Sequence, residues 1–164
     1  MTDDDLNKLS SEIGQRLQSL KATMTTAESC TGGWIAKVIT DIPGSSCWFE
    51  RGFVTYSNQS KQEMVGVTPD SLTQYGAVSE QVVREMAEGA RAAAGADFSI
   101  SVSGIAGPDG GSEEKPVGTV WFGFAAANQE TLTQRQVFSG DREAVRRQAT
   151  AWGLLTLYRH FLKK

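Results

Sequence analysis

The sequence concentrates its candidate nucleophiles in the stretch "ESCTGG" at residues 28–33, where Ser29, Cys30 and Thr31 stand side by side before two glycines. A strand that enters a helix through small polar residues directs backbone N–H groups toward one point, where anions and oxyanions are stabilised. The spacing matches neither a P-loop lysine motif nor a dinucleotide-binding fingerprint. Three readings remain: a nucleophile turn, a phosphate cradle, or a helix start simply capped by Ser29 or Thr31.

A hydroxyl nucleophile needs a partner base, and the sequence contains a single histidine, His160. That histidine lies in "YRHFLKK" near the end of the last predicted helix, where a cation is favourable, so we do not expect a Ser-His-Asp triad. The stretch "YSNQSK" instead offers Tyr56 and Lys61 just after a predicted strand. For about 10% of Lys61 to be neutral at pH 7, its pKa must fall by about 2.4 units, which burial or a nearby cation can achieve. From spacing alone, an exposed lysine on a short helix remains the competing reading.

A glycine-rich segment, "SGIAGPDGGSEEKPVGTV" at residues 103–120, could approach a ligand closely with its backbone. The alternative is an ordinary surface loop. Its acidic residues Asp109, Glu113 and Glu114 are not spaced as a calcium loop and are expected to face solvent. Further on, "SGDREAVRR" places Arg142 and Arg146 one turn apart at the start of a helix, where together they could receive a phosphate. Solvated surface arginines are the competing interpretation.

Several elements must position these residues, and their patterns alternate between period two and helical spacing. "GTVWFGFAA" is apolar on both faces, as in a covered strand, whereas "TLTQRQVF" is polar enough for a sheet edge. We therefore predict an α/β protein, a three-layer α/β/α sandwich with a mixed sheet. The aromatic pair Trp48 and Phe49 is expected in the core. The predicted strands are residues 22–27, 47–57, 96–104, 118–126 and 131–138, and the predicted helices are 3–21, 34–42, 58–65, 80–94 and a last one capped by Asp141.

Composition limits the classes of function. The chain has 164 residues, 40% hydrophobic residues and a formal net charge of -3, which fits one globular domain over residues 1–164. The charges are interspersed, so we expect no direct nucleic-acid contact. No apolar run reaches membrane-spanning length and no signal peptide is recognisable, so we expect a cytoplasmic protein without a membrane partner. Two cysteines and one histidine do not make a zinc site, so no metal is expected. No cofactor is expected either.

Taken together, "AESCTGG", "VTYSNQSK", "VSGIAGPDGGSEEKPVGTV" and "FSGDREAVRRQA" closely resemble the CinA C-terminal domain family. More narrowly, they resemble its stand-alone members, the nicotinamide-nucleotide amidohydrolases. The resemblance covers nearly the whole chain. It implies a three-layer α/β/α fold and hydrolysis of the carboxamide of nicotinamide mononucleotide to nicotinate mononucleotide and ammonia, as part of pyridine-nucleotide salvage. The implied partner is thus a small molecule, while the oligomeric state stays open and a homo-oligomer is allowed.

The resemblance also implies roles for individual residues. Ser29 would be the nucleophile, and Lys61 and Tyr56 would be its activating pair. Arg142 would bind the phosphate of the substrate. The remaining implied residues line the turn or shape the pocket: Thr31, Gly32 and Gly33 in the turn, and Gly104, Ile105, Ala106, Gly107, Pro108 and Thr119 around the pocket.

Three alternatives to this reading stay open at the level of sequence. The same pocket could bind a nucleotide in a regulatory module without turning it over. The chain could be a competence- or recombination-related adaptor, although the absence of a basic stripe argues against DNA contact. Finally, the enzyme could use Cys30 or Thr31 as its nucleophile, because spacing alone does not distinguish them from Ser29.

Overall fold

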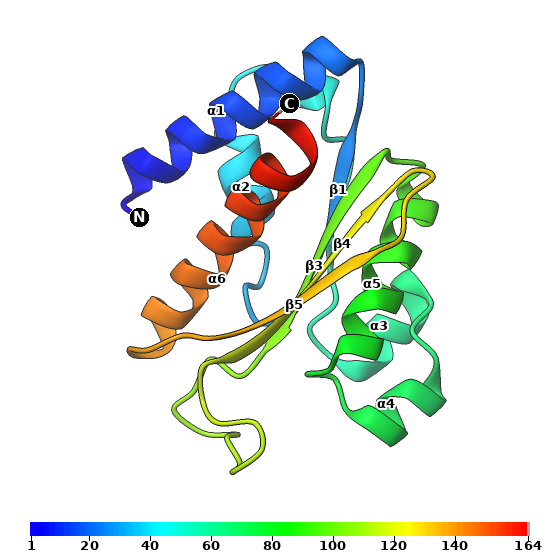
Figure 1. Ribbon diagram of the computed structural model, residues 1–164, viewed down its shortest axis with the longest axis vertical. Helices are drawn as coiled ribbons and strands as arrows, with labels where there is room; N and C mark the ends of the chain where they lie inside the picture. The colour runs from blue at the N-terminus through cyan, green and yellow to red at the C-terminus, as the bar shows by residue number, and fades with distance from the viewer. Residues whose placement is uncertain (164) are drawn as a thin grey trace.

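The computed structural model describes residues 1–163, in which helices cover both faces of one sheet (Figure 1). No helix in this described range is both long and apolar enough to span a bilayer. The strands are β1 (Met24–Glu28), β2 (Phe53–Val54), β3 (Phe98–Gly104), β4 (Thr119–Ala126) and β5 (Leu132–Val137). The helices are α1 (Asp3–Leu20), α2 (Trp34–Thr40), α3 (Asn58–Val65), α4 (Pro69–Tyr75), α5 (Glu80–Ala94) and α6 (Arg142–Leu157), and a π-helical turn (Tyr158–Leu162) continues α6.

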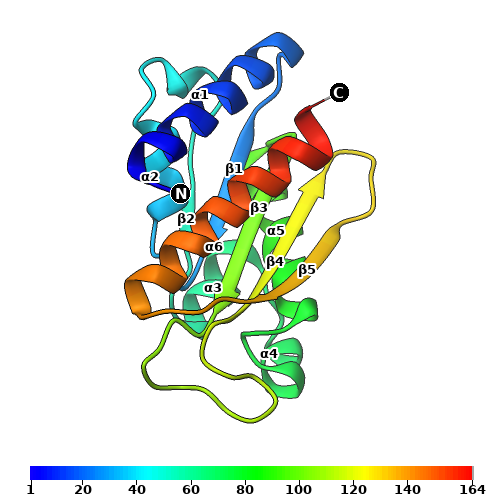
Figure 2. The same cartoon turned by 60° about the vertical axis from the view of Figure 1, so that its left-hand side comes forward.

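The sheet has the strand order β2-β1-β3-β4-β5 and combines both pairing directions. β1 lies parallel to β2 and β3, whereas β4 runs antiparallel to β3 and β5. In Figure 1, α1, α2 and α6 lie on one side of the sheet and α3, α4 and α5 on the other, and Figure 2 shows the same division. The prediction of a three-layer α/β/α sandwich with a mixed sheet is therefore confirmed.

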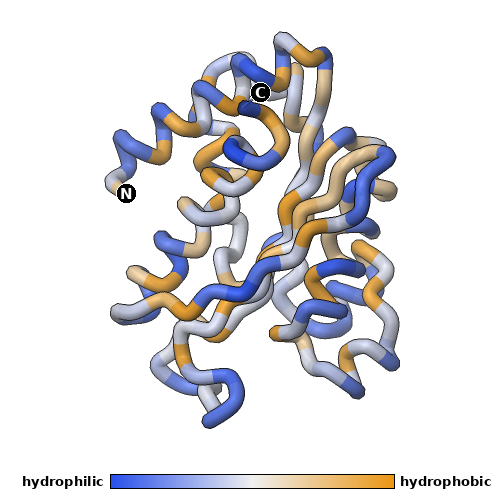
Figure 3. Tube along the Cα trace, viewed as in Figure 1, coloured by the Kyte–Doolittle hydropathy of each residue, from blue (hydrophilic) through white to orange (hydrophobic). Residues whose placement is uncertain are grey.

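Burial along the strands follows their place in the sheet. β3 and β4 are covered on both faces, as the apolar pattern predicted for the second of them. The serines that alternate in β3 are buried as well, and Ser101 Oγ donates a hydrogen bond to the Val83 carbonyl oxygen of α5 over 2.6 Å. β5 is the polar edge strand that the sequence predicts, and its hydrophilic residues appear as a blue stretch in Figure 3.

Polar caps start the helices where the sequence predicts them. The Ser79 side chain accepts a hydrogen bond from the Val82 N–H, and the Asp141 carboxylate accepts one from the Ala144 N–H. These bonds satisfy N–H groups that the first helical turn leaves without a partner. α5 then ends at Gly95, whose φ of 62° lies in the left-handed region.

The structure corrects the strand predicted over residues 47–57. Within this stretch only Phe53–Val54, which is β2, forms a strand, and it pairs with β1. Ser45–Cys47 forms a 3-10 turn, and Phe49 makes an isolated bridge to Met24. The aromatic residues that suggested a long strand serve the core instead, because Trp48 and Phe49 are buried, as expected. The aromatic residues of this stretch thus indicate burial in the core rather than pairing in the sheet.

Helix α4 is absent from the elements that the sequence patterns predict. No residue of this helix is buried, so it carries no apolar stripe that periodicity could detect. A local signal was nevertheless present: Thr68 caps the helix through the Ser71 N–H, and Pro69 occupies its first position. Threonine followed by proline is a typical helix start.

The glycine-rich loop crosses the end of the sheet that carries the carboxyl ends of the parallel strands (Figure 2). Its base is closed by backbone hydrogen bonds from Ile105 N to Thr119 O over 2.9 Å and from Gly118 N to Ile105 O over 2.7 Å. Gly118 has a φ of 96°, and a Cβ atom there would lie 2.0 Å from the Phe138 carbonyl oxygen. Only glycine fits at that position, so the loop has a defined shape at its base.

Candidate active site

A cavity of about 290 Å³ lies where β1, β2 and β3 end. Because these strands are parallel, their carboxyl ends meet at one edge, which is where open α/β sheets bind ligands. The volume is close to the lower end of the range for small-molecule sites, roughly 300–1,000 Å³. Its lining residues are Ser29, Cys30, Tyr56, Asn58, Lys61, Ala77, Val78, Ser103, Gly104, Ala106 and Arg142.

Ser29 and Lys61 are in direct contact in this cavity. The Lys61 Nζ atom lies 2.9 Å from Ser29 Oγ, 2.8 Å from the Thr55 carbonyl oxygen and 3.3 Å from the Tyr56 carbonyl oxygen. Ser29 directly follows β1, whereas Lys61 comes from α3, whose start is set by a capping box between Ser57 and Ser60. The sheet edge and a locally capped helix therefore bring together two residues that are 32 positions apart.

Burial makes the Lys61 amine a weaker base than that of an ordinary lysine. Its side chain is only 1% exposed, and desolvation lowers its pKa from 10.5 to about 8, against a smaller opposing effect of the nearby Cys30 thiol. Its hydrogen-bond partners are neutral oxygens rather than carboxylates, so no hydrogen-bonded carboxylate stabilises the ammonium form. With such a pKa about 10% of Lys61 is neutral at pH 7. The requirement set by the sequence analysis is met, and the reading of Lys61 as an exposed lysine is wrong.

The two neighbours of Ser29 are less suited to attack. Burial raises the pKa of the Cys30 thiol to about 12, so this thiol is protonated at neutral pH and lacks the reactive thiolate. The Thr31 hydroxyl is buried and donates a hydrogen bond to Glu28 Oε1 over 2.7 Å. The geometry therefore favours Ser29 among the three candidates, because its hydroxyl is the one in contact with the lysine.

Glu28 is a structural residue of this turn that the sequence analysis did not single out. Its fully buried carboxylate accepts hydrogen bonds from the Thr31 hydroxyl and from the N–H groups of Ile35 and Ala36 at 2.9 and 3.0 Å. Desolvation is the largest effect on this group and raises its pKa. Glu28 thus supplies the cap of α2, whose N-cap residue Gly33 makes no side-chain bond. The reading of Ser29 or Thr31 as the helix cap is wrong.

Tyr56 participates through two different atoms. Its carbonyl oxygen accepts a hydrogen bond from Lys61 Nζ and a second one from the Ser29 hydroxyl over 3.4 Å. The phenol is 62% exposed, and its Oη accepts a hydrogen bond from Arg142 Nη2 over 3.3 Å. Arg142 Nη1 also donates to the Gly107 carbonyl oxygen over 2.8 Å. Arg142 therefore joins Tyr56 and the glycine-rich loop at the cavity, and the phenol bonds to Arg142 rather than to Ser29.

The other predicted loop residues divide into two groups. Gly104 and Ala106 line the cavity, whereas Pro108 is exposed and does not. Ile105 and Thr119 act on the shape of the loop, since the Ile105 N–H donates to Thr119 O and the Thr119 hydroxyl donates to Pro116 O over 2.6 Å.

The predicted turn residues Thr31, Gly32 and Gly33 do not line the cavity. They border a separate, more open surface depression beside Trp34, Arg146 and Arg147. Arg146 also borders this depression, and its Nε donates a hydrogen bond to the Cys30 carbonyl oxygen over 2.9 Å. Arg142 and Arg146 therefore do not share one ligand site, although they are one helical turn apart.

Four further residues of the cavity wall were not predicted from the sequence, namely Asn58, Ala77, Val78 and Ser103. A signal existed for two of them. Asn58 precedes Lys61 by three positions and so lies on the same face of α3. Ser103 ends the alternating serines of β3 and is 1% exposed, next to the strand that carries Ser29. Ala77 and Val78 lie in the connection between α4 and α5, which has no such pattern.

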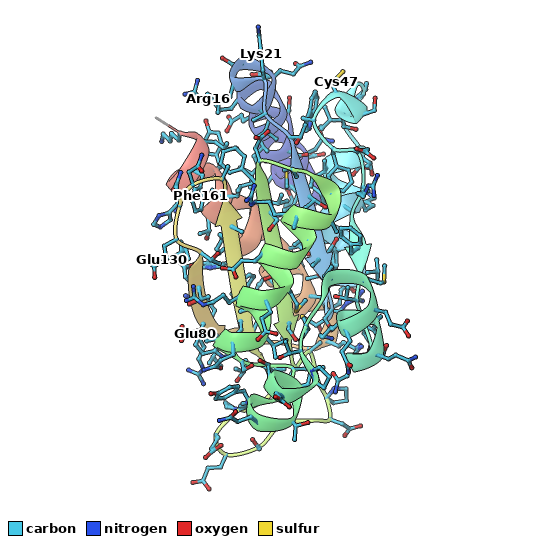
Figure 4. All side chains as sticks on the ribbon, turned by 90° about the vertical axis from the view of Figure 1, so that its right-hand side faces the viewer. Arg16, Lys21, Cys47, Glu80, Glu130 and Phe161 are labelled. Carbon is cyan, nitrogen blue, oxygen red and sulfur yellow. The ribbon has the colours of Figure 1, made fainter. Side chains whose placement is uncertain are left out.

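The residues considered for other chemistry lie elsewhere. His160 is exposed at the end of the last helix, and Asp109, Glu113 and Glu114 face solvent as expected. Cys47 is exposed and lies at the same end of Figure 4 as Lys21, opposite the glycine-rich loop. Within residues 1–163, no group of three or more histidine, cysteine, aspartate or glutamate side chains is arranged to hold a metal ion.

Comparison with known proteins identifies relatives over the full length of the fold. The nicotinamide-nucleotide amidohydrolase PncC of Escherichia coli K12 is 67% identical over 163 residues, which cover 99% of both chains. The protein of the same name from Pseudomonas putida is 52% identical over 157 residues, covering 94% of this chain and 98% of the relative. Among solved structures, the competence/damage inducible protein CihA of Agrobacterium tumefaciens superposes with a TM-score of 0.92 at 42% identity, covering 94% of each chain.

The family model of the CinA C-terminal domain matches residues 6–161, which include every segment that builds the cavity. The motifs, the arrangement of the layers and the relatives agree on one assignment. The chain belongs to the CinA C-terminal domain family.

Proposed function

We propose that the protein hydrolyses the carboxamide of nicotinamide mononucleotide, producing nicotinate mononucleotide and ammonia. The observation that carries this proposal is the 2.9 Å contact between Ser29 Oγ and the buried Lys61 Nζ. A serine beside a lysine of lowered pKa is an activated nucleophile for acyl transfer. The substrate class is supported by relatives that are named nicotinamide-nucleotide amidohydrolases and share up to 67% of their residues with this chain.

The proposed reaction has two halves. Neutral Lys61 takes the proton of the Ser29 hydroxyl as Oγ bonds to the amide carbon, and backbone N–H groups of the turn hold the resulting oxyanion. The carbon–nitrogen bond then breaks, and protonated Lys61 returns the proton to the leaving nitrogen, which departs as ammonia. Lys61 then takes a proton from the water that bonds to the acyl carbon, and it returns that proton to Ser29 Oγ as the carbon–Oγ bond breaks and the carboxylic acid leaves. Because the Tyr56 phenol bonds to Arg142, we assign the proton transfers of both halves to Lys61 alone. The part of Tyr56 is to hold the Lys61 amine through its carbonyl oxygen.

The proposed phosphate site is Arg142. Its guanidinium uses one N–H toward Gly107 and one toward Tyr56, which leaves further donors of its five for an anion. Arg142 is also the first residue of the 16-residue helix α6, whose N-terminus favours negative charge. The amide would then lie at Ser29 and the phosphate at the mouth of the cavity.

The direct test is to incubate the purified protein with nicotinamide mononucleotide and measure ammonia release. We expect release that stops when Ser29 is blocked covalently. No release at high protein concentration, combined with measurable binding of the nucleotide, would support a regulatory binding module and overturn the hydrolase proposal.

Replacing Arg142 by alanine should raise KM for nicotinamide mononucleotide by about 10- to 100-fold, the range expected for losing charge-assisted hydrogen bonds. The value of kcat should change much less, because Arg142 does not contact Ser29 or Lys61. Steady-state kinetics check this. Arg147→Ala is the matched control, since Arg147 lies on the same helix but pairs with Asp3. An unchanged KM in Arg142→Ala would place the phosphate elsewhere.

The pH dependence of kcat/KM should show an acid limb with an apparent pKa of about 8. Only neutral Lys61 accepts the serine proton, so activity falls as pH drops below this value and levels off above it. The profile should be recorded from pH 6.5 upward, because a phosphate monoester titrates at about pH 6. A flat profile between about pH 6.5 and 9 would contradict Lys61 as the base.

A further inference from the structure

The turn that carries Ser29 is held from behind by a second arginine of α6. Arg146 Nε donates to the Cys30 carbonyl oxygen over 2.9 Å, and Arg146 Nη2 donates to the Thr31 carbonyl oxygen over 3.3 Å. Arg146 is half-buried, and it does not line the cavity that contains Ser29 and Lys61. Its contacts are therefore with the backbone of the turn and not with the space that a substrate would occupy.

Arginine is the side chain suited to this contact. Its planar fork presents several donors in fixed directions, so one guanidinium can hold two neighbouring carbonyls, which a lysine cannot do with the same geometry. The guanidinium is itself confined, because it lies 5.8 Å from the centre of the Trp34 ring. Gly32 has a φ of 61°, and a Cβ atom there would approach Arg146 Nη2 to 3.2 Å. Arg146 thus holds the turn, and Gly32, which has no side chain, leaves room for the Arg146 guanidinium.

Holding these carbonyls also fixes the N–H groups of the turn. In a planar trans peptide the C=O and the following N–H point in opposite directions, so directing the Cys30 carbonyl to Arg146 directs the Thr31 N–H away from it. The preceding peptide is fixed as well, because the Ser29 carbonyl oxygen accepts from Gly32 N over 3.0 Å. Within residues 1–163, the Cys30 N–H has no oxygen acceptor, and Cys30 lines the cavity next to Ser29, whereas Thr31 does not.

We infer that Arg146 is a positioning residue for the reaction: by holding the Cys30 and Thr31 carbonyls it fixes the turn after Ser29, so that the Cys30 N–H at the cavity is placed to hold the oxyanion formed when Ser29 attacks. This inference rests on the proposed function for its substrate but not for its geometry. It distinguishes the two arginines of α6, since Arg142 lies at the cavity and Arg146 acts through the backbone of the turn.

The first experiment does not depend on the natural substrate. A fluorophosphonate reacts when Ser29 Oγ bonds to phosphorus, fluoride leaves and Lys61 takes the hydroxyl proton, and the attacked centre develops the same kind of oxyanion. Arg146→Lys should slow this labelling by about tenfold or more, because loosened donors stabilise the oxyanion less. Arg147→Lys, the matched control on the same helix, should label at the rate of the parent protein. Equal rates for Arg146→Lys and the parent would overturn the inference, as would an equal slowing by both variants.

The second experiment uses ammonia release from nicotinamide mononucleotide. Arg146→Lys should lower kcat by about tenfold or more while KM changes by less than about threefold, the pattern of an interaction made only in the transition state. In Arg146→Ala, added guanidinium ion should restore part of kcat, whereas an equal concentration of sodium ion should not. A rise in KM at constant kcat would make Arg146 a binding residue and overturn the inference. If the parent released no ammonia but Arg146→Lys still slowed labelling, the proposed substrate would fail and the positioning role would stand.

Discussion

Replacing Ser29 by alanine should lower kcat for ammonia release by about 10,000-fold or more, the scale at which loss of a catalytic nucleophile acts. The reason is that Ser29 Oγ is the atom in contact with Lys61, and alanine leaves no group to bond to the amide carbon. KM should change little, since the phosphate contact proposed for Arg142 remains. The measurement is single-turnover ammonia release at high protein concentration, which detects slow residual rates.

Two matched variants make this prediction specific to Ser29. Cys30→Ala should keep kcat within about tenfold of the parent value, because a thiol with a pKa of about 12 is not a nucleophile at neutral pH. Thr31→Ala should lower stability through loss of the bond to Glu28 and retain measurable turnover. Full activity in Ser29→Ala, or abolished activity in Cys30→Ala with the fold intact, would show that the nucleophile is another residue of this turn.

Replacing Lys61 by methionine should lower kcat by about 1,000-fold, within the range that a general base contributes, with little change in KM. Methionine keeps the length and apolar stem of the side chain but cannot accept a proton. Lys37→Met is the matched control, because Lys37 is exposed and pairs with Asp41. If Lys61→Met retained the parent kcat, the base would have to be another group.

Lys61→Met should also change how stability depends on pH. The folded-state pKa of Lys61 is about 8, below the ordinary value of 10.5, so the unfolded chain binds this proton more tightly. The contribution of Lys61 to stability is therefore fully present above about pH 10.5 and is lost as pH falls through about 8. At pH 7 the loss is up to about 3 kcal/mol, as a shift of this size implies.

The measurement is urea unfolding of the parent and of Lys61→Met between about pH 7 and 10. The free energy of unfolding of the parent, relative to Lys61→Met, should rise with pH over this range. Other titrating groups are common to both proteins and cancel in the difference. A difference that stays constant with pH would show that the pKa of Lys61 is not lowered by folding.

Local signals in the sequence were sufficient for much of the fold. Ser79, Gly95 and Asp141 mark helix ends through bonds between near neighbours, so α5 begins and ends, and α6 begins, where these residues predict. The strand near residues 47–57 was overestimated, since the burial of Trp48 and Phe49 and the shortness of β2 depend on contacts outside that stretch.

The sequence by itself determined the chemical inventory of the site: a serine in a polar turn, a lysine after a strand, a glycine-rich loop and an arginine at a helix start. These depend on residue types and short spacings, which the chain carries before it folds. Only the tertiary structure decided how they act. The burial and lowered pKa of Lys61, and its contact with Ser29, arise because α3 packs beside the end of β1, 32 residues away. The different partners of Arg142 and Arg146 also follow from packing, because α6 meets the loop at one turn and the Ser29 turn at the next.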